Sequence, residues 1–183
     1  MASSKLFEPL QIGRITLNHR IVMAPLTRFR ASDEHAHTQL AAKYYEQRAS
    51  VPGTLLITEA TFIAPRAAGY ANVPGLWSHK QLAAWRAVTD AVHAKGSFIF
   101  VQLWALGRAA SPAQLQMEAF GDVVGPSDVP IRGRATPRPL NDAEIWEYVH
   151  LYAAAAKNAV EVAGFDGVEL HGANGSVFGS ACL

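Results

Sequence analysis

The stretch that decides between fold classes is residues 19–28, HRIVMAPLTR. A short apolar run ends at Pro25, and Leu26, Thr27 and Arg28 follow it without a glycine. A doubly wound open sheet that binds a dinucleotide carries a Gly-x-Gly-x-x-Gly turn after its first strand. Because that turn is absent, the stretch favours the other fold with parallel strands, an eight-stranded β/α barrel.

Outward from this stretch, strand-like and helix-like patterns alternate. Apolar runs at 54–63 (TLLITEATFI), 97–107 (SFIFVQLWALG) and 165–172 (FDGVELHG) follow the first, and helical patterns at 37–50, 78–96 and 141–164 separate them. Nearly continuous apolar strands are typical of a parallel sheet that is covered on both faces. We therefore predict an α/β fold: the N-terminal half, about four strand–helix units, of a TIM (β/α)8 barrel.

The helical patterns carry start and stop signals. Ser78 and Gln81 have the spacing of a capping box, and Gly96 stands where a helix ends. The predicted buried stripe of this helix is Leu82, Trp85, Val88 and Val92, and that of the 37–50 helix is Leu40, Ala41, Tyr44 and Tyr45. Asn141 or Asp142 is expected to cap the longest helix, which should stop at Gly164.

We predict one partial barrel domain over 1–183. Residues 1–19 form a β-hairpin cap with its turn at Gly13 and Arg14, residues 20–175 hold strands one to four, and 176–183 form an aberrant tail. A loop of about thirty residues, in which Arg132, Arg134 and Arg138 are interpreted as solvated, precedes the longest helix.

Composition excludes several classes of protein. A net charge of +1 gives no basic footprint for nucleic acid, and no apolar run reaches the roughly 18 residues of a membrane span. Cys182 is the single cysteine, so neither an internal disulfide nor a thiolate metal site can form. No signal peptide is visible, and we expect a soluble, cytoplasmic protein without a metal.

Every predicted strand ends in polar groups, and chemistry in such barrels sits at the C-terminal strand ends. These ends bear Thr27, then Glu59 beside Ala60, then Gln102 with Trp104, and lastly His171 with Asn174. Gln102 alone could be a satisfied core glutamine and His171 alone a structural histidine, but a ring of polar groups suits a flat ligand with several acceptors. Glu59 is interpreted as structural, because nothing in the sequence places a carboxylate partner beside it. Zinc-ligand spacing, a Gly-x-Ser-x-Gly elbow and a phosphate-binding Gly-Lys loop are absent.

Several long motifs resemble the old yellow enzyme family of FMN-dependent NAD(P)H ene-reductases, especially its fungal secondary-metabolism members such as chanoclavine-aldehyde reductases. The motifs occur in the family's order between about residues 5 and 175: LFEPLQIGRITLNHRIVMAPLTRFRA (6–31), YYEQRASVPGTLLITEATFIAP (44–65), GLWS (75–78), FVQLWALGRAA (100–110) and AGFDGVELHGANG (163–175). The resemblance implies hydride transfer from reduced FMN to the β-carbon of an α,β-unsaturated aldehyde or ketone, with NAD(P)H as reductant.

The resemblance also implies roles for individual residues. Contacts to the flavin ring fall to Pro25, Leu26, Thr27, Ala60, Gln102 and His171. Trp104 would shape the substrate pocket, and His171 with Asn174 would hold the substrate carbonyl oxygen as an oxyanion hole does.

The chain departs from the family in two places. The residue after HGANG is Ser176 where the family usually has a tyrosine that donates a proton, and a serine hydroxyl is a far weaker acid. We interpret the tail 176–183 as the product of a frameshift, a retained intron or a misplaced exon boundary. The second half of the barrel, where the flavin phosphate usually binds, is missing. We therefore expect weak or no activity from the chain alone. One alternative is a non-catalytic half-barrel that dimerises or binds a partner through its exposed edge strands. Another is that the native protein is full length and this sequence is a fragment of it.

Overall fold

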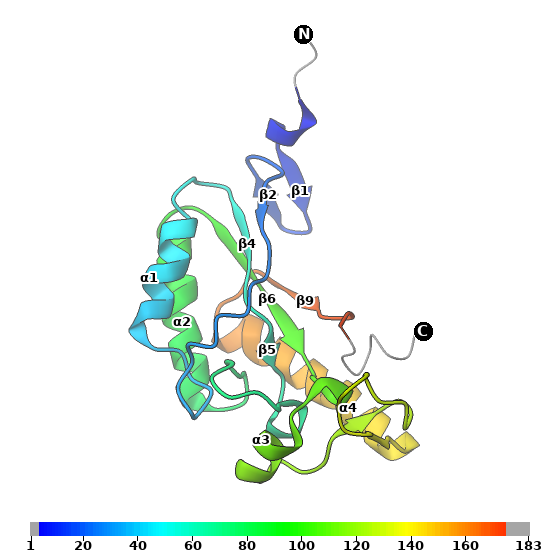
Figure 1. Ribbon diagram of the computed structural model, residues 1–183. Helices are drawn as coiled ribbons and strands as arrows, with labels where there is room; N and C mark the ends of the chain where they lie inside the picture. The colour runs from blue at the N-terminus through cyan, green and yellow to red at the C-terminus, as the bar shows by residue number, and fades with distance from the viewer. Residues whose placement is uncertain (1–3, 175–183) are drawn as a thin grey trace.

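The computed structural model describes residues 4–174, and they form the N-terminal half of a β/α barrel (Figure 1). The central sheet is parallel, and β4 and β6 lie between the edge strands β3 and β9. The strands are β3 (Val22–Met23), β4 (Leu55–Ile57), β6 (Phe98–Trp104) and β9 (Gly167–Leu170), and the helices that follow the first three are α1 (Gln39–Arg48), α2 (His79–His93) and α4 (Asp142–Lys157). The predicted half-barrel is confirmed, with three strand–helix units and a fourth strand in the described residues.

Strand β6 has a nearly continuous apolar sequence because both of its faces are covered. Ile99, Val101 and Leu103 are fully buried on the outer face, in one core with residues of α1, α2 and α4. Phe98 and Phe100 point to the opposite, inner face of the sheet, and Gln102 follows them there. Both faces of this strand are therefore covered over most of its length, the outer one by helices.

The predicted second strand is divided in two. Residues 55–57 pair with 98–100 as β4, and β5 (Thr61–Phe62) pairs with Leu103 and Trp104 on the same side of β6. Four residue steps separate Ile57 from Thr61, against three on β6, so the interruption holds one extra residue, as a β-bulge does. Glu59 and Ala60 lie in this interruption, which redirects their side chains at the C-terminal end of the sheet.

The capped helices form as predicted. Ser78 and Gln81 make both hydrogen bonds of a capping box at α2, and Asn141 with Glu144 makes the same pair at α4. Each cap is worth about 1 kcal/mol. Helix α4 continues into a π-helical turn, η4 (Asn158–Val162), before Gly164 at φ +78°. Gly96, at φ +72°, follows the end of α2.

One of the two predicted buried stripes is wrong in part. Leu82, Trp85, Val88 and Val92 of α2 are buried as predicted. On α1, Tyr45 is fully buried but Leu40 is 68% exposed. Because α1 contacts mainly α2, its buried face is narrower than the apolar pattern suggested.

The predicted hairpin closes one end of the half-barrel. It begins with a short 3-10 turn, η1 (Lys5–Phe7), and its strands β1 (Leu10–Ile12) and β2 (Ile15–Leu17) pair antiparallel around Gly13 and Arg14. Ile15 and Leu17 pack against Leu55, with Phe98 and Phe100 alongside. These contacts involve the first residues of β4 and β6, so the hairpin covers the N-terminal strand ends, opposite the predicted site (Figure 1).

The long loop before α4 is more ordered than predicted. It holds η3 (Gly107–Ala109), helix α3 (Pro112–Met117) and the short pair β7 (Val124–Gly125) and β8 (Arg138–Pro139), while η2 (Pro65–Ala67) lies after β5. Its three arginines are exposed, as predicted, and two of them also bind partners within the chain. Arg134 donates to the Ala109 carbonyl at 2.6 Å, and Arg138 binds the Glu144 carboxylate with two hydrogen bonds.

Candidate active site

The C-terminal strand ends carry the predicted site residues at one end of the sheet. Pro25, Leu26 and Thr27 follow β3, Ala60 lies between β4 and β5, and Gln102 and Trp104 are in β6. His171 follows β9, and its backbone N–H donates to the Leu103 carbonyl at 3.0 Å. The end of β9 is thereby held against the end of β6.

Trp104 and His171 form the core of the arrangement. Their rings stack with centroids 5.4 Å apart and an interplanar angle of 21°. Phe62 stacks on Trp104 as well, at 5.4 Å, and fixes the indole from the neighbouring strand. The indole Nε1 of Trp104 is buried and has no hydrogen-bond partner among the described residues. A buried donor without a partner beside a histidine indicates a place for a polar ligand.

The imidazole of His171 is set up to donate a hydrogen bond. Its Nδ1 accepts the Ala173 backbone N–H at 3.3 Å, which puts the proton of the neutral ring on Nε2. Burial lowers the pKa of His171 below its usual 6.5, against an opposing effect of the Glu169 charge. At neutral pH the ring is therefore neutral, with Nε2 as the donor.

Gln102 has the hydrogen-bond partner that its burial demands. Its Nε2 donates to Glu169 Oε1 at 2.7 Å, because the two residues lie directly opposite each other on β6 and β9. Gln102 is therefore a hydrogen-bonded core glutamine, as one of the two interpretations predicted. Its amide oxygen can in addition accept a hydrogen bond from a ligand.

The remaining predicted residues lie at the margin of the described chain. Asn174 is exposed and adopts φ +59°, a left-handed conformation that asparagine tolerates. Ser176, the tail 176–183 and Cys182 lie outside the described residues, so their predicted roles stay predictions.

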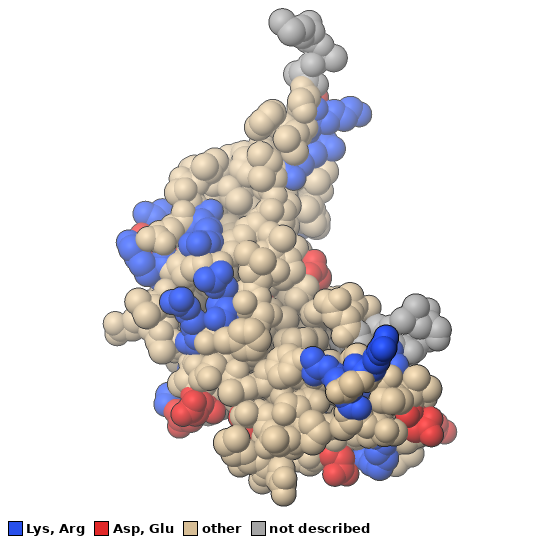
Figure 2. All heavy atoms as spheres, in the orientation of Figure 1, with Lys and Arg blue, Asp and Glu red and all other residues tan. Residues whose placement is uncertain are grey.

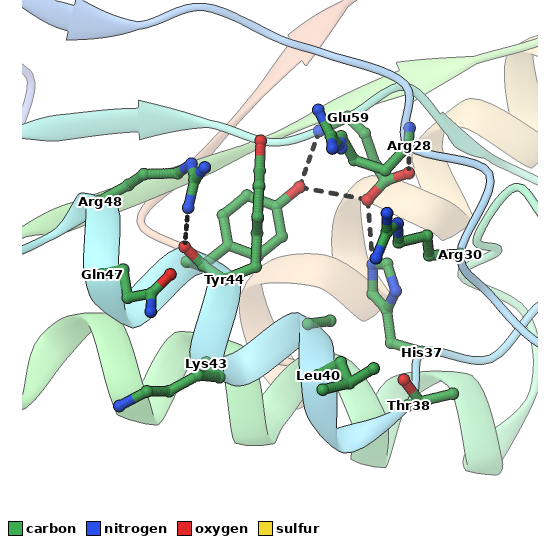
Figure 3. Close-up of a pocket in the computed structure, with 12 residues that line it drawn as sticks. Arg28, Arg30, His37, Thr38, Leu40, Lys43, Tyr44, Gln47, Arg48 and Glu59 are labelled. Carbon is green, nitrogen blue, oxygen red and sulfur yellow. Dashed lines mark hydrogen bonds and ion pairs between the residues drawn. The ribbon is translucent and has the colours of Figure 1, made fainter.

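Glu59, which the sequence interpretation left as structural, has three partners in the folded chain. It is 2% exposed, and its Oε2 accepts the Arg28 backbone N–H at 3.1 Å. The Tyr45 hydroxyl donates to Oε1 at 3.4 Å and accepts the Glu59 N–H at 3.0 Å, and His37 Nε2 lies 3.7 Å from Oε1 (Figure 3). None of these partners is a carboxylate, and all three are distant from Glu59 in the sequence. Its place beside Ala60 at a strand end is the signal that the sequence offered.

Basic side chains surround the outer opening of this cluster. A cavity of ≈270 Å³ is lined on its floor by Glu59, His37 and Tyr45 and at its mouth by Arg28, Arg30, Lys43 and Arg48. Figure 2 shows Lys and Arg side chains gathered over the region of α1. The cavity contains none of the predicted flavin or substrate residues, so it is separate from the Trp104–His171 stack.

Burial shifts the two titratable groups in opposite directions. It raises the pKa of Glu59 from 4.5 to about 7, although the hydrogen bonds from Arg28 and Tyr45 oppose it. It lowers the pKa of His37 from 6.5 to about 4. Both groups therefore favour the neutral form in the folded protein.

Raising the pH should destabilise the wild-type protein relative to E59Q. Between pH 4.5 and 7 folded Glu59 holds a proton that the unfolded chain has lost, so stability falls as the pH rises through this window. The free energy of unfolding, from urea denaturation of both proteins at pH 5 and pH 8, should change by about 2 to 3 kcal/mol more in the wild type. E46Q is the control, because hydrogen bonds from Lys95 and Lys43 lower the pKa of that exposed carboxyl. An equal slope in wild type and E59Q would contradict the prediction.

The sequence matches the model of the NADH:flavin oxidoreductase / NADH oxidase family over residues 5–178. The chain belongs to this family. It is 58% identical to "Chanoclavine-I aldehyde reductase fgaOx3" of Penicillium roqueforti, over 94% of this chain and 47% of that protein. It is 56% identical to "Probable inactive reductase easA" of Epichloe festucae var. lolii, over 96% of this chain and 46% of the relative. The old yellow enzyme of Pichia sp. AKU4542 superposes with a TM-score of 0.91 at 39% identity, over 96% of this chain and 48% of the other.

These matches confirm the predicted family and half-barrel fold. The chain spans about half the length of the curated relatives that it matches. Membership of the NADH:flavin oxidoreductase family implies FMN as cofactor. The described residues fit a flavin ring: the small Ala60, the Thr27 hydroxyl, the Gln102 amide and the unpaired Trp104 N–H lie at one end of the sheet.

Two features are absent from the described residues. None of the helices between residues 4 and 174 has the length and apolar character needed to cross a membrane. In the same residues no three His, Cys, Asp or Glu side chains come together as metal ligands could.

Proposed function

We propose that this chain carries the flavin-ring and substrate-carbonyl half of an FMN-dependent NAD(P)H ene-reductase. Its substrate would be an α,β-unsaturated aldehyde or ketone, in fungal secondary metabolism such as alkaloid synthesis. The observation that carries the proposal is the stack of His171 on Trp104, which holds an Nε2–H donor at the strand ends.

Each site residue has a role that its chemistry suits. When bound, FMN would supply the hydride that the β-carbon of the substrate accepts. Negative charge then grows on the substrate oxygen, where His171 Nε2–H and the Asn174 amide would donate, each worth roughly 3 kcal/mol if well placed. Trp104 would shape the pocket, and Thr27 and Gln102 would hydrogen-bond the flavin ring, with Pro25, Leu26 and Ala60 against it.

The proton for the α-carbon has a weak source in this chain. Ser176 occupies the position of the family's usual tyrosine donor, and its hydroxyl is a much weaker acid than a phenol of pKa about 10. Water that reaches the open side of the half-barrel would take over this step.

The proposal is tested by titrating the purified chain with FMN and following the flavin fluorescence. We expect reversible quenching with weak affinity, because phosphate sites in such barrels are usually built after strands seven and eight. NADPH oxidation with 2-cyclohexen-1-one should be slow. Absence of any quenching would contradict the proposal, whereas a stably yellow, fully active protein would contradict the weak binding.

A non-catalytic half-barrel that associates through its open sides is the second candidate. Apolar side chains are exposed on the edge strands: Val22 of β3 is 38% exposed and Leu170 of β9 57%. That a relative is described as a probable inactive reductase also favours it. Light scattering coupled to size exclusion would show a dimer or larger species under this proposal, and a monomer at all concentrations would contradict it.

A further inference from the structure

Glu59 occupies a backbone position that is itself held rigidly. Its carbonyl oxygen accepts hydrogen bonds from the Thr58 and Thr61 hydroxyls, each at 2.9 Å. Both threonines are fully buried, and the Thr58 hydroxyl also accepts the Gln102 backbone N–H at 3.2 Å. The extra residue between β4 and β5 is thus tied to the centre of the sheet, and the Glu59 carboxylate projects from a fixed base.

That carboxylate connects three elements that are distant in sequence. It accepts from the backbone of the β3 loop through Arg28 and from α1 through the Tyr45 hydroxyl, while its own chain segment belongs to the β4–β5 interruption (Figure 3). Tyr45 in turn accepts the Glu59 N–H, so hydroxyl and glutamate are bonded reciprocally. His37 lies beside the same carboxylate, with its Nε2 3.7 Å from Glu59 Oε1.

The loop after β3 has few other restraints. Within residues 26–30, the Arg28 N–H is the only backbone group that makes a hydrogen bond to the described part of the chain. Arg28 directly follows Thr27, the hydroxyl proposed to meet the flavin. Loss of this hydrogen bond would therefore displace the neighbouring Thr27, which is the proposed flavin contact.

We propose that Glu59 is a positioning residue that fixes the loop 25–30, and with it Thr27, through its hydrogen bond to the Arg28 amide and its bond to Tyr45. Its importance for the flavin rests on the function proposed above, whereas the tether itself does not. The role differs from that of a group buried only for stability, because it acts on the loop geometry.

Hydrogen exchange of individual amides tests the tether without any flavin. In E59L the acceptor is lost, and the Arg28 amide should exchange about tenfold faster. The Ala31 amide donates to the Asn72 carbonyl and should keep its protection as an internal reference. In E59Q the amide oxygen can still accept, so protection should be retained.

Tyr148→Phe is the matched control for a lost buried hydroxyl. Tyr148 donates to the Arg66 carbonyl at 3.0 Å, far along the chain from the loop. The Y148F variant should leave the exchange rate of the Arg28 amide as it is in the wild type. Unchanged Arg28 exchange in folded E59L would overturn the proposal.

If E59L does not fold, wild-type NMR decides the question. The Arg28 amide resonance should shift with the same midpoint as the Glu59 side-chain carboxyl carbon, and the neighbouring titratable groups His37 and Tyr45 are followed in the same spectra. An Arg28 resonance that does not follow the Glu59 carboxyl would overturn the tether.

FMN fluorescence titration separates the two proposals. E59L should bind FMN about fivefold more weakly than Y148F, because an unfixed loop must be ordered on binding. If the wild type binds no FMN, the proposed function fails and the tether is still judged by exchange. If E59L frees the Arg28 amide but binds FMN like the wild type, the positioning role fails.

Discussion

Replacing Trp85 by alanine is expected to lower the free energy of unfolding by about 3 to 5 kcal/mol. Trp85 is 1% exposed, and its ring lies 4.2 Å from that of His37 and 5.3 Å from that of Phe165. Its Nε1 also donates to the Gly75 carbonyl at 3.2 Å, which the variant leaves without this donor. Because Trp85 joins α2 to the segments that precede α1 and β9, a cavity here loosens the outer core. Urea denaturation followed by circular dichroism measures the loss.

Trp146→Ala is the matched control for this variant. Trp146 is 66% exposed on α4, so its removal should change the free energy of unfolding by less than about 0.5 kcal/mol. Equal losses in the two variants would show that Trp85 does not occupy the core as described. A larger loss for Trp146 would show instead that its exposed face is covered by another chain in solution.

Replacing His171 by alanine is expected to lower the rate of NADPH-dependent enone reduction, above the background without protein, by about 100-fold. The variant removes the Nε2–H that the hydrogen bond from Ala173 to Nδ1 sets up as a donor. The rate is measured with excess FMN and 2-cyclohexen-1-one. His150→Ala, an exposed histidine on α4, is the control and should retain the wild-type rate. A small effect of H171A beside a measurable wild-type rate would remove His171 from the proposed role.

The elements that could be predicted are those with local signals. The capping boxes at Ser78 and Asn141 and the hairpin turn at Gly13 depend on residues a few positions apart, and all three form. The grouping of polar residues at the strand ends could also be predicted, since parallel strands bring their C-terminal ends together. Gln102 on β6 and His171 directly after β9 accordingly lie at the ends of adjacent strands.

The predictions that failed depended on contacts between distant residues. Leu40 has the helical spacing of a buried residue, yet nothing in the described chain covers that part of α1. The 54–63 run reads as one strand, because the extra residue between β4 and β5 shows only in the pairing with β6.

The amino-acid pattern alone was enough to specify the family, the half-barrel and the residues at its strand ends, because periodicity and motifs are properties of neighbouring positions. Glu59 shows what needed the folded chain. Its partners Arg28 and Tyr45 are 31 and 14 positions away, and a hydrogen bond over that separation is specified by how β3, α1 and the β4–β5 interruption pack. Packing also removes Glu59 and His37 from water, and this loss of solvation, which no local pattern encodes, shifts their pKa values in opposite directions.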